Sequence, residues 1–268
     1  MNAQPCFSVI ICSVNAWNFA QASQCYERLL AGWPHEIIGI HDAPSLAEGY
    51  NRGMARSRGD ILVFSHDDIL ILDPDFAAKI SERLRTRAIL GFAGTSRLTG
   101  PAWYGSGYPH LHGVVARRDK TCFRLGIYGV SEWPVIGNIQ AIDGRCMIAT
   151  REAAQATGFD AVTFDSFFLC DLDFSFAACR AGFRLGVCCD IPFFHGSGDN
   201  HDQHQRQKYA GRFLAKYAEL EETPPERAVR EPEGRFALFQ NHRAVLAAWQ
   251  PDVLKRAGIA MGRRNPVS

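Results

Sequence analysis

The chain has 268 residues, of which 47% are hydrophobic and 21% charged, an ordinary composition for a globular protein that excludes a disordered chain. Its formal net charge of +1 gives no global field that would select nucleic acid. We therefore expect no nucleic-acid partner. No apolar stretch approaches the length that spans a membrane, so we also expect no transmembrane segment.

The first third of the chain alternates short apolar runs with amphipathic stretches. The runs predict strands, and the stretches, with apolar residues at helical spacing, predict helices. The predicted strands cover residues 7–12, 36–40, 61–64 and 88–93. The predicted helices cover residues 17–30, 46–59 and 76–87, and the second begins after a capping box formed by Ser45 and Glu48. This alternation predicts an α/β fold with a doubly wound, mostly parallel sheet.

The third predicted strand organises the chain. Its unbroken apolar run is typical of a central strand that is buried on both faces. It is followed directly by Ser65, His66, Asp67 and Asp68, at the carboxyl end of the strand, where open α/β sheets place their ligand sites. Adjacent carboxylates repel each other unless a cation lies between them, which favours a divalent metal site. The alternative is a solvated turn that caps the next helix.

Residues 95–137 show no clear period. The segment is rich in glycine and in aromatic residues, namely Trp103, Tyr104, Tyr108, Tyr128 and Trp133. A long irregular stretch inside a compact domain is typical of a functional loop or lid. Its aromatic rings either stack on sugar rings or pack the loop itself.

Regular structure resumes after this segment. A strand is predicted over residues 139–149, interrupted by Asp143 and Gly144. Helices are predicted over 151–157, 171–180 and 208–220, a strand over 183–189, and a turn that carries Pro192 and His195. A Pro-rich boundary at 223–226 divides the chain into a domain of residues 1–222 and an extension of residues 223–268, which combines a linker with a helix at 243–254.

The order of these motifs resembles the family 2 glycosyltransferases with the GT-A fold, and in particular the bacterial branch with His-x-Asp in place of Asp-x-Asp. The resemblance covers residues 7–198. It is carried by Ser8-Val9-Ile10-Ile11-Cys12-Ser13, residues 36–42, Asn51-Arg52-Gly53, Gly59-Asp60, His66-Asp67-Asp68, Asp143-Gly144, Asp171-Leu172-Asp173 and His195. It implies a GT-A-type, Rossmann-like fold, with a mostly parallel central sheet flanked by helices and, here, a C-terminal helical extension.

The resemblance also implies an activity. It implies a metal-dependent, inverting transfer of a sugar from a UDP- or GDP-linked donor to an acceptor hydroxyl. The leaving diphosphate gains charge, which a bound cation stabilises as a Lewis acid. The implied metal ligands are Asp67, Asp68 and His195; carboxylates suit Mg²⁺ or Mn²⁺, and the imidazole favours Mn²⁺. Surface polysaccharide or glycoconjugate synthesis follows from family analogy alone.

The remaining site residues are assigned by their positions in the same motifs. Asp171 matches the catalytic base, which takes the proton of the attacking hydroxyl; the alternative for Asp171 is a helix N-cap. The donor site is expected to include Ser13, Asn15, Asp42, Asn51, His66 and Asp67. For Ser13 and Asn15 the alternative is ordinary turn chemistry. The acceptor or sugar pocket is expected to include Trp103, Asp143, Gly144 and Asp173.

Two departures from the family pattern keep a second function open. His66 stands in place of the first acid of Asp-x-Asp, and Cys170 in place of the Glu before the base. The alternative is therefore a catalytically inactive GT-A domain that binds nucleotide sugars or serves assembly. A helical His-Asp phosphohydrolase does not fit, because the His66–Asp67 pair follows a strand. A dinucleotide-dependent oxidoreductase lacks its Gly-rich turn, and a zinc site at His195, His201 and His204 lacks a supporting motif.

The compartment is read from the cysteines and the first residues. Nine Cys residues without regular spacing indicate small buried side chains in a reducing compartment. The first residues have no basic region or long apolar run, so they do not resemble a signal peptide. We therefore expect a cytoplasmic protein, and a homodimer is compatible with the chain.

Overall fold

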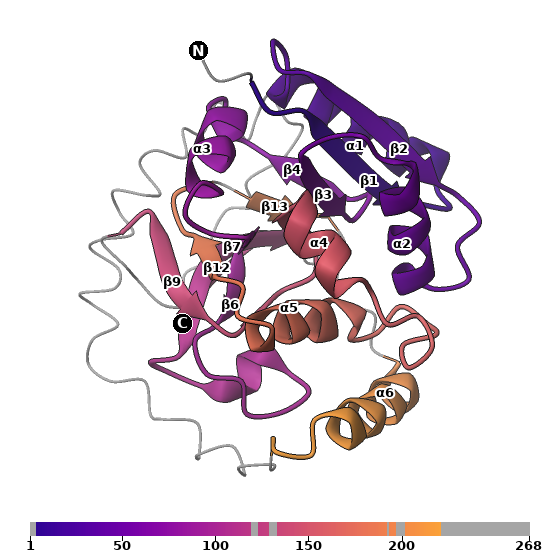
Figure 1. Ribbon diagram of the computed structural model, residues 1–268, viewed down its shortest axis with the longest axis vertical. Helices are drawn as coiled ribbons and strands as arrows, with labels where there is room; N and C mark the ends of the chain where they lie inside the picture. The colour runs from indigo at the N-terminus through magenta and orange to yellow at the C-terminus, as the bar shows by residue number, and fades with distance from the viewer. Residues whose placement is uncertain (1–3, 119–122, 129–132, 192, 197–201, 221–268) are drawn as a thin grey trace, which may run out of the picture.

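The computed structural model describes residues 4–118, 123–128, 133–191, 193–196 and 202–220. Its centre is a seven-stranded sheet in the order β2-β1-β3-β11-β5-β12-β9 (Figure 1). The strands are β1 (Phe7–Cys12), β2 (His35–Ile40), β3 (Ile61–Ser65), β5 (Ile89–Gly91), β9 (Val135–Ile139), β11 (Cys146–Thr150) and β12 (Leu185–Cys188).

Most strands of this sheet run in one direction. The strand β1 is parallel to β2 and β3, and β11 is antiparallel to both β3 and β5, so β5 is parallel to β3. The strand β12 is parallel to β5, and β9 at the edge is antiparallel to β12. The predicted mostly parallel sheet is therefore confirmed. Every residue of β3 is buried, because β3 lies between β1 and β11 with helices over the sheet.

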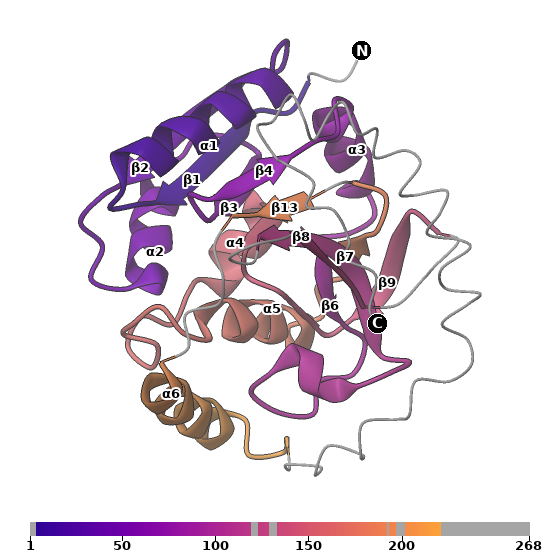
Figure 2. The ribbon, with the colours of Figure 1, turned by 180° about the vertical axis from the view of Figure 1, so that it is seen from behind.

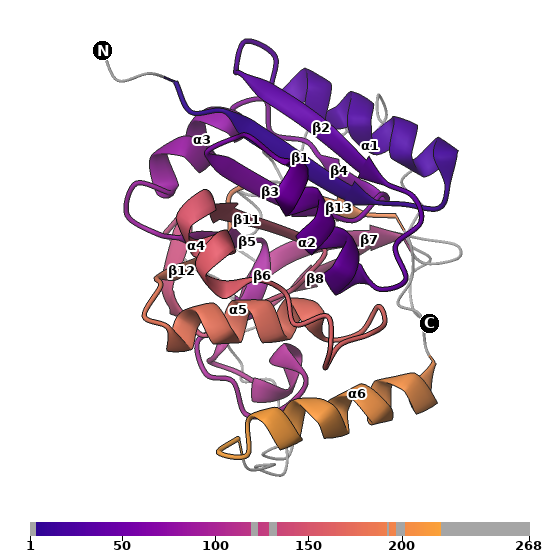
Figure 3. The same cartoon turned by 45° about the vertical axis from the view of Figure 1, so that its right-hand side comes forward.

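Helices cover both faces of the sheet. They are α1 (Ala16–Leu29), α2 (Leu46–Arg56), α3 (Phe76–Arg83), α4 (Arg151–Thr157), α5 (Cys170–Arg180) and α6 (Gln203–Lys216). Figures 2 and 3 show α1 on the side of β4, and α2 and α4 on the opposite side. The predicted cap of α2 is present, since Ser45 Oγ accepts a hydrogen bond from Glu48 N at 3.1 Å.

The remaining strands form a second sheet. It has six strands, in the order β10-β6-β7-β13-β4 with β8 paired to β7. They are β4 (Ile69–Ile71), β6 (Ala93–Thr95), β7 (Leu111–Arg118), β8 (Phe123–Ile127), β10 (Ala141–Ile142) and β13 (Phe193–His195). Its pairings join β4 to β13, and β13 to β7, across long stretches of sequence.

This sheet corrects several expectations. Residues 95–137 are not one irregular loop, because they contain β7, β8, the start of β9 and a short 3₁₀ turn at Trp103–Ser106. The predicted strand 88–93 is split into β5 and β6, which belong to different sheets. The predicted strand 139–149 is divided among the last residue of β9, β10 and β11. Strands this short leave little periodic signal, and their partners lie far away in sequence.

The carboxyl-terminal part is described only to residue 220. The helix predicted at 208–220 begins earlier, because Asp202 caps α6 by accepting from Gln205 N at 3.1 Å. The predicted boundary at 223–226, the helix at 243–254, the extension 223–268 and His201 lie outside the described residues. Among the helices that are described, none combines the length and the apolar character needed to cross a lipid bilayer.

Candidate functional site

The site forms where the chain passes from one sheet to the other. After β3 the chain turns through His66, Asp67 and Asp68 and enters β4 in the second sheet. The strand β13 runs antiparallel to β4, with His195 opposite Ile69. Gly196 N donates a hydrogen bond to Asp68 O at 2.8 Å, which fixes the two segments side by side. The fold therefore brings His195 next to a turn more than a hundred residues earlier in the chain.

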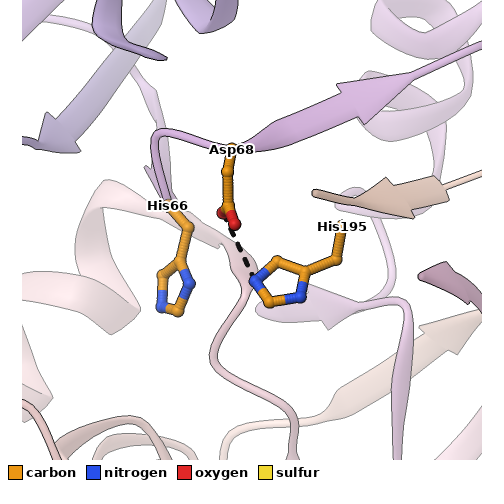
Figure 4. Close-up of side chains that lie close together, drawn as sticks. All are labelled: His66, Asp68 and His195. Carbon is orange, nitrogen blue, oxygen red and sulfur yellow. Dashed lines mark ion pairs between the residues drawn. The ribbon is translucent and has the colours of Figure 1, made fainter. Parts of the chain in front are cut away.

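Three side chains converge at this point. One ligand atom each from His66, Asp68 and His195 lies within 4.8 Å of the others (Figure 4). His195 Nε2 is 3.3 Å from Asp68 Oδ1, and the ring centres of His66 and His195 are 5.7 Å apart. Burial, followed by the neighbouring His195, lowers the pKa of His66 and so favours the neutral ring, which can bind a cation.

The ring nitrogens of His195 indicate that this cluster could bind a further group. The His195 side chain is buried, and neither ring nitrogen makes a hydrogen bond within the part of the chain that the structure describes. Its Nε2 faces Asp68 Oδ1 at 3.3 Å, and a buried polar group that makes no hydrogen bond destabilises the fold unless another group binds it. The cluster therefore fits a divalent cation, and two imidazoles with one carboxylate suit Mn²⁺ better than Mg²⁺.

Asp67 is directed elsewhere. Its Oδ2 accepts a hydrogen bond from Ser13 Oγ at 2.5 Å, and Ser13 O is 2.8 Å from His41 Nδ1. This contact ties the carboxyl end of β3 to that of β1. Of the expected ligands Asp67, Asp68 and His195, the structure brings the last two together with His66, which the sequence assigned to the donor.

Asp171 lies at the start of α5, against Gly144. A side chain at position 144 would overlap the Asp171 carboxyl group, so only glycine allows this approach. Burial, followed by the nearby charge of Asp143, raises the pKa of Asp171 to about 6, although backbone N–H groups, including that of Gly144, oppose the shift. A carboxylate with a raised pKa is a stronger base than usual, as general-base catalysis requires.

The turn at 143–145 links Asp171 to the His66 cluster. Asp143 accepts from Arg145 N at 3.0 Å and forms an ion pair with the Arg145 guanidinium group. On the other side of the turn, Arg145 O accepts from His66 N at 3.0 Å. The sequence analysis did not identify Arg145; its position directly after Asp143-Gly144 was the available signal.

Two expected donor residues, Asn15 and Asp42, follow the carboxyl ends of β1 and β2, and each contacts residues close to it in sequence. Asn15 caps α1, accepting from Trp17 N at 3.0 Å and from Asn18 N at 3.1 Å. Asp42 is exposed, and its carboxylate is 2.8 Å from the guanidinium of Arg52. Both side chains are exposed.

Three other residues lie away from the expected pockets. The amide of Asn51 bridges Phe159 O at 2.7 Å and Phe159 N at 3.0 Å, so it joins α2 to the loop after α4. The Trp103 ring is buried, with Tyr128 at 4.8 Å between ring centres. Asp173 is buried and accepts from Tyr217 Oη at 2.7 Å, because two positions along a helix turn it away from Asp171. Trp103 and Asp173 were expected in the acceptor or sugar pocket, and in the structure both side chains are buried and make these contacts within the protein.

Comparison with known proteins gives a family and a fold. The family described as glycosyltransferase like family matches residues 8–217. The solved mannosyltransferase PcManGT from Pyrobaculum calidifontis, in complex with GDP-Man and Mn²⁺, is similar with a TM-score of 0.51 and 14% identity, covering 92% of this chain and 75% of that chain. The A197 protein from STIV matches with a TM-score of 0.41 and 10% identity, covering 72% of this chain and 86% of that chain. No curated protein sequence matches. The likeness to PcManGT bears on the fold alone and confirms the predicted GT-A-type architecture.

Proposed function

The chain belongs to the glycosyltransferase-like family, and on this basis we propose that it transfers a sugar from a nucleotide-linked donor to an acceptor hydroxyl, with inversion and with a divalent cation. One observation carries the proposal. The 143–145 turn contacts the carboxyl group of Asp171 through Gly144 and the backbone of His66 through Arg145, so the proposed base and the proposed cation ligands lie on either side of one turn. In a metal-dependent transfer, the base accepts the proton of the acceptor hydroxyl and the cation stabilises the leaving diphosphate.

The cation would be held by His66, Asp68 and His195. When bound there, it supplies Lewis-acid stabilisation of the charge that develops on the leaving diphosphate. The similar mannosyltransferase was solved with GDP-Man and Mn²⁺, and for this chain we propose a UDP- or GDP-linked donor with Mn²⁺ or Mg²⁺. Ser13 and Asp67, joined by their hydrogen bond at the ends of β1 and β3, are placed to line the donor site together with Asn15 and Asp42.

Asp171 acts as the general base. Inversion by a single displacement needs only one carboxylate, which accepts the proton of the acceptor hydroxyl as that oxygen attacks the anomeric carbon. With a pKa of about 6, Asp171 is ionised at neutral pH and yet holds a proton more tightly than an exposed aspartate does. Asp143 contributes by raising this pKa, and Arg145 compensates the charge of Asp143.

A donor panel tests the proposal. The full-length protein is incubated with UDP- and GDP-linked sugars and Mn²⁺, and release of the nucleoside diphosphate is measured for the wild type and for Asp171→Asn. Asp75→Asn is the matched control, because Asp75 is an exposed carboxylate at the start of α3 that makes no capping hydrogen bond. We expect release with at least one donor, loss of release in Asp171→Asn, and an unchanged rate in Asp75→Asn.

The same panel distinguishes the alternative function. Donor binding without release, equal in the wild type and in Asp171→Asn, would identify a nucleotide-sugar-binding module instead of an enzyme. The replacement of the usual family acids by His66 and Cys170 motivates this alternative. Cys170 is fully buried and burial raises the pKa of its thiol, so it does not substitute for an acid in the site.

A further inference from the structure

The helix α6 presents one polar and aromatic face to the segment that leads into α5. Figure 3 shows α6 lying alongside α5. The residues of this face recur every three or four positions, as side chains on one side of a helix do, and they are Tyr209, Arg212, Phe213, Lys216 and, at the helix end, Tyr217. Opposite them lie three carboxylates, Asp160, Asp165 and Asp173.

The first two carboxylates belong to the loop between α4 and α5. Asp165 Oδ1 accepts from Tyr209 Oη and from Arg212 Nη1, each at 2.6 Å. Asp160 Oδ2 accepts from Lys216 Nζ at 2.8 Å. The loop that precedes Asp171 is therefore held by α6 along its length.

The third carboxylate belongs to α5 itself. Asp173 is 1% exposed, and its Oδ1 lies 2.8 Å from Lys216 Nζ and 2.7 Å from Tyr217 Oη. Because Lys216 Nζ contacts both Asp160 and Asp173, one ammonium group joins the loop to the first turn of α5. Charge-assisted hydrogen bonds of this kind are stronger and more directional than neutral ones.

The first turn of α5 needs such support. Leu169, directly before the helix, has a φ of 62°, a left-handed conformation that is unfavourable for a leucine, and its side chain makes no capping hydrogen bond. Asp171 and Asp173 both lie in this turn, two positions apart, so their side chains leave the helix on nearly opposite sides. A displacement of Asp173 would therefore move Asp171 away from Gly144.

From this arrangement we infer that α6 is a clasp, in which Lys216 and Tyr217 act as positioning residues that hold Asp173 and thereby keep Asp171 in place against Gly144. The clasp rests on the proposed function, because it gives Asp171 its role as the base. In this inference Asp173 supports the position of Asp171 and does not contact the substrate. The helix α6 is then required for activity.

Two measurements on the full-length protein test the clasp. The first is nucleoside diphosphate release with the donor found by the panel, separated into kcat and KM. The second is amide hydrogen exchange of residues 169–174, which needs no substrate. The variants are Lys216→Met, Tyr217→Phe and the conservative Lys216→Arg. The matched control is Glu219→Gln, which removes an ion pair with Arg180 between half-exposed side chains at the other end of α5.

We expect Lys216→Met to lower kcat by about 10- to 100-fold, the loss that a displacement of roughly 1 Å produces, with little change in KM. Exchange at residues 169–174 should become faster. Tyr217→Phe should show the same changes to a smaller extent, Lys216→Arg should restore most of both, and Glu219→Gln should equal the wild type. If Lys216→Met does not fold, Tyr217→Phe serves as the test of the clasp. This variant removes only the hydroxyl that binds Asp173, so we expect it to fold.

The clasp is wrong if kcat and exchange stay at wild-type values in Lys216→Met and Tyr217→Phe while Asp171→Asn still abolishes release. Wild-type release in Asp171→Asn is a different result, since it removes the proposed base. The exchange measurement still judges the clasp in that case, and unchanged protection of residues 169–174 in Lys216→Met overturns it.

Discussion

The two sides of the first turn of α5 hold their carboxylates in opposite ways. On the side of α6, Asp173 is bound by Lys216 and Tyr217. On the side of the site, Asp171 rests against Gly144 next to a second acid, Asp143, and burial together with this neighbour raises its pKa. A buried carboxylate with bound partners stabilises the fold. A carboxylate held near another acid keeps an affinity for protons that catalysis can use.

The histidines repeat this contrast. His35 Nδ1 is 2.8 Å from Trp33 O, and its Nε2 is 3.0 Å from Glu27 Oε2, so both ring nitrogens have partners. His195 is more deeply buried, its Nε2 faces Asp68 Oδ1 at 3.3 Å, and neither of its nitrogens makes a hydrogen bond among the described residues. The hydrogen bonds of these side chains thus distinguish His35 from the proposed cation ligand His195, and single substitutions can test this distinction.

The largest expected effect is on turnover in Asp171→Asn. Loss of a general base lowers the rate by about 10²- to 10⁴-fold, while donor affinity should stay close to that of the wild type. Asp173→Asn should lower the rate less, because Asp173 acts only through the position of its neighbour. The measurement is kcat for nucleoside diphosphate release, with donor binding followed by calorimetry. Equal losses in both variants would contradict the separation of the two sides of α5.

The next effect concerns metal affinity and compares two histidines. His195→Ala should weaken Mn²⁺ binding by at least about 100-fold, since even residues that only support metal ligands contribute 10- to 100-fold. His35→Ala should leave Mn²⁺ binding unchanged, because its imidazole is already bonded far from the cluster. Calorimetric titration of the full-length protein with Mn²⁺ alone measures both. Tight binding that survives in His195→Ala would place the cation elsewhere.

Burial raises the pKa of both carboxylates, Asp171 and Asp173, but replacing each one by Asn should change stability in a different direction, because only Asp173 has charged and hydroxyl partners. Because the pKa of Asp171 is raised to about 6, the folded protein holds a proton there between about pH 4 and pH 6, where the unfolded chain releases it. This contribution to stability is lost as the pH rises through that window. At pH 7.5 Asp171→Asn should therefore be more stable than the wild type, by up to about 3 kcal/mol.

Asp173→Asn should instead lose about 1 to 3 kcal/mol, because Lys216 and Tyr217 lose a charged acceptor. Urea unfolding in chelator at pH 7.5 and pH 4 measures both variants. The advantage of Asp171→Asn over the wild type should shrink toward zero at the lower pH. A destabilised Asp171→Asn at pH 7.5 would show that its carboxylate serves the fold, as that of Asp173 does.

The sequence predicted the first third of the fold well because its signals are local. The run at residues 7–12 and the Ser45 cap each specify an element through neighbouring residues alone, and the structure places β1 and the start of α2 at those positions. The second sheet depends on pairings such as that of β13 with β4, which no local pattern reveals. For the same reason His195 was expected in a turn.

Only part of the candidate site could be predicted from the sequence. The turn after β3 and the start of α5 could be found, since each follows or opens an element with a clear pattern. The distinction between Asp67 and Asp68 could not, because it depends on Ser13 and His195 from other strands. The contacts of Asp173 could not be predicted, because α6, whose residues bind it, has no visible relation to α5 in the sequence.

The smallest expected effect concerns Asn51, whose sequence position predicts a donor contact and whose amide in the structure bridges Phe159. If the bridge is its role, Asn51→Ala should lower the free energy of unfolding by about 2 kcal/mol, because two partly buried backbone groups of Phe159 lose their partners. The KM for the donor should not change. Urea unfolding and donor titration of the same preparation measure both quantities. A raised KM with unchanged stability would return Asn51 to the donor site and would show that a side chain with satisfied hydrogen bonds can still serve binding in this protein.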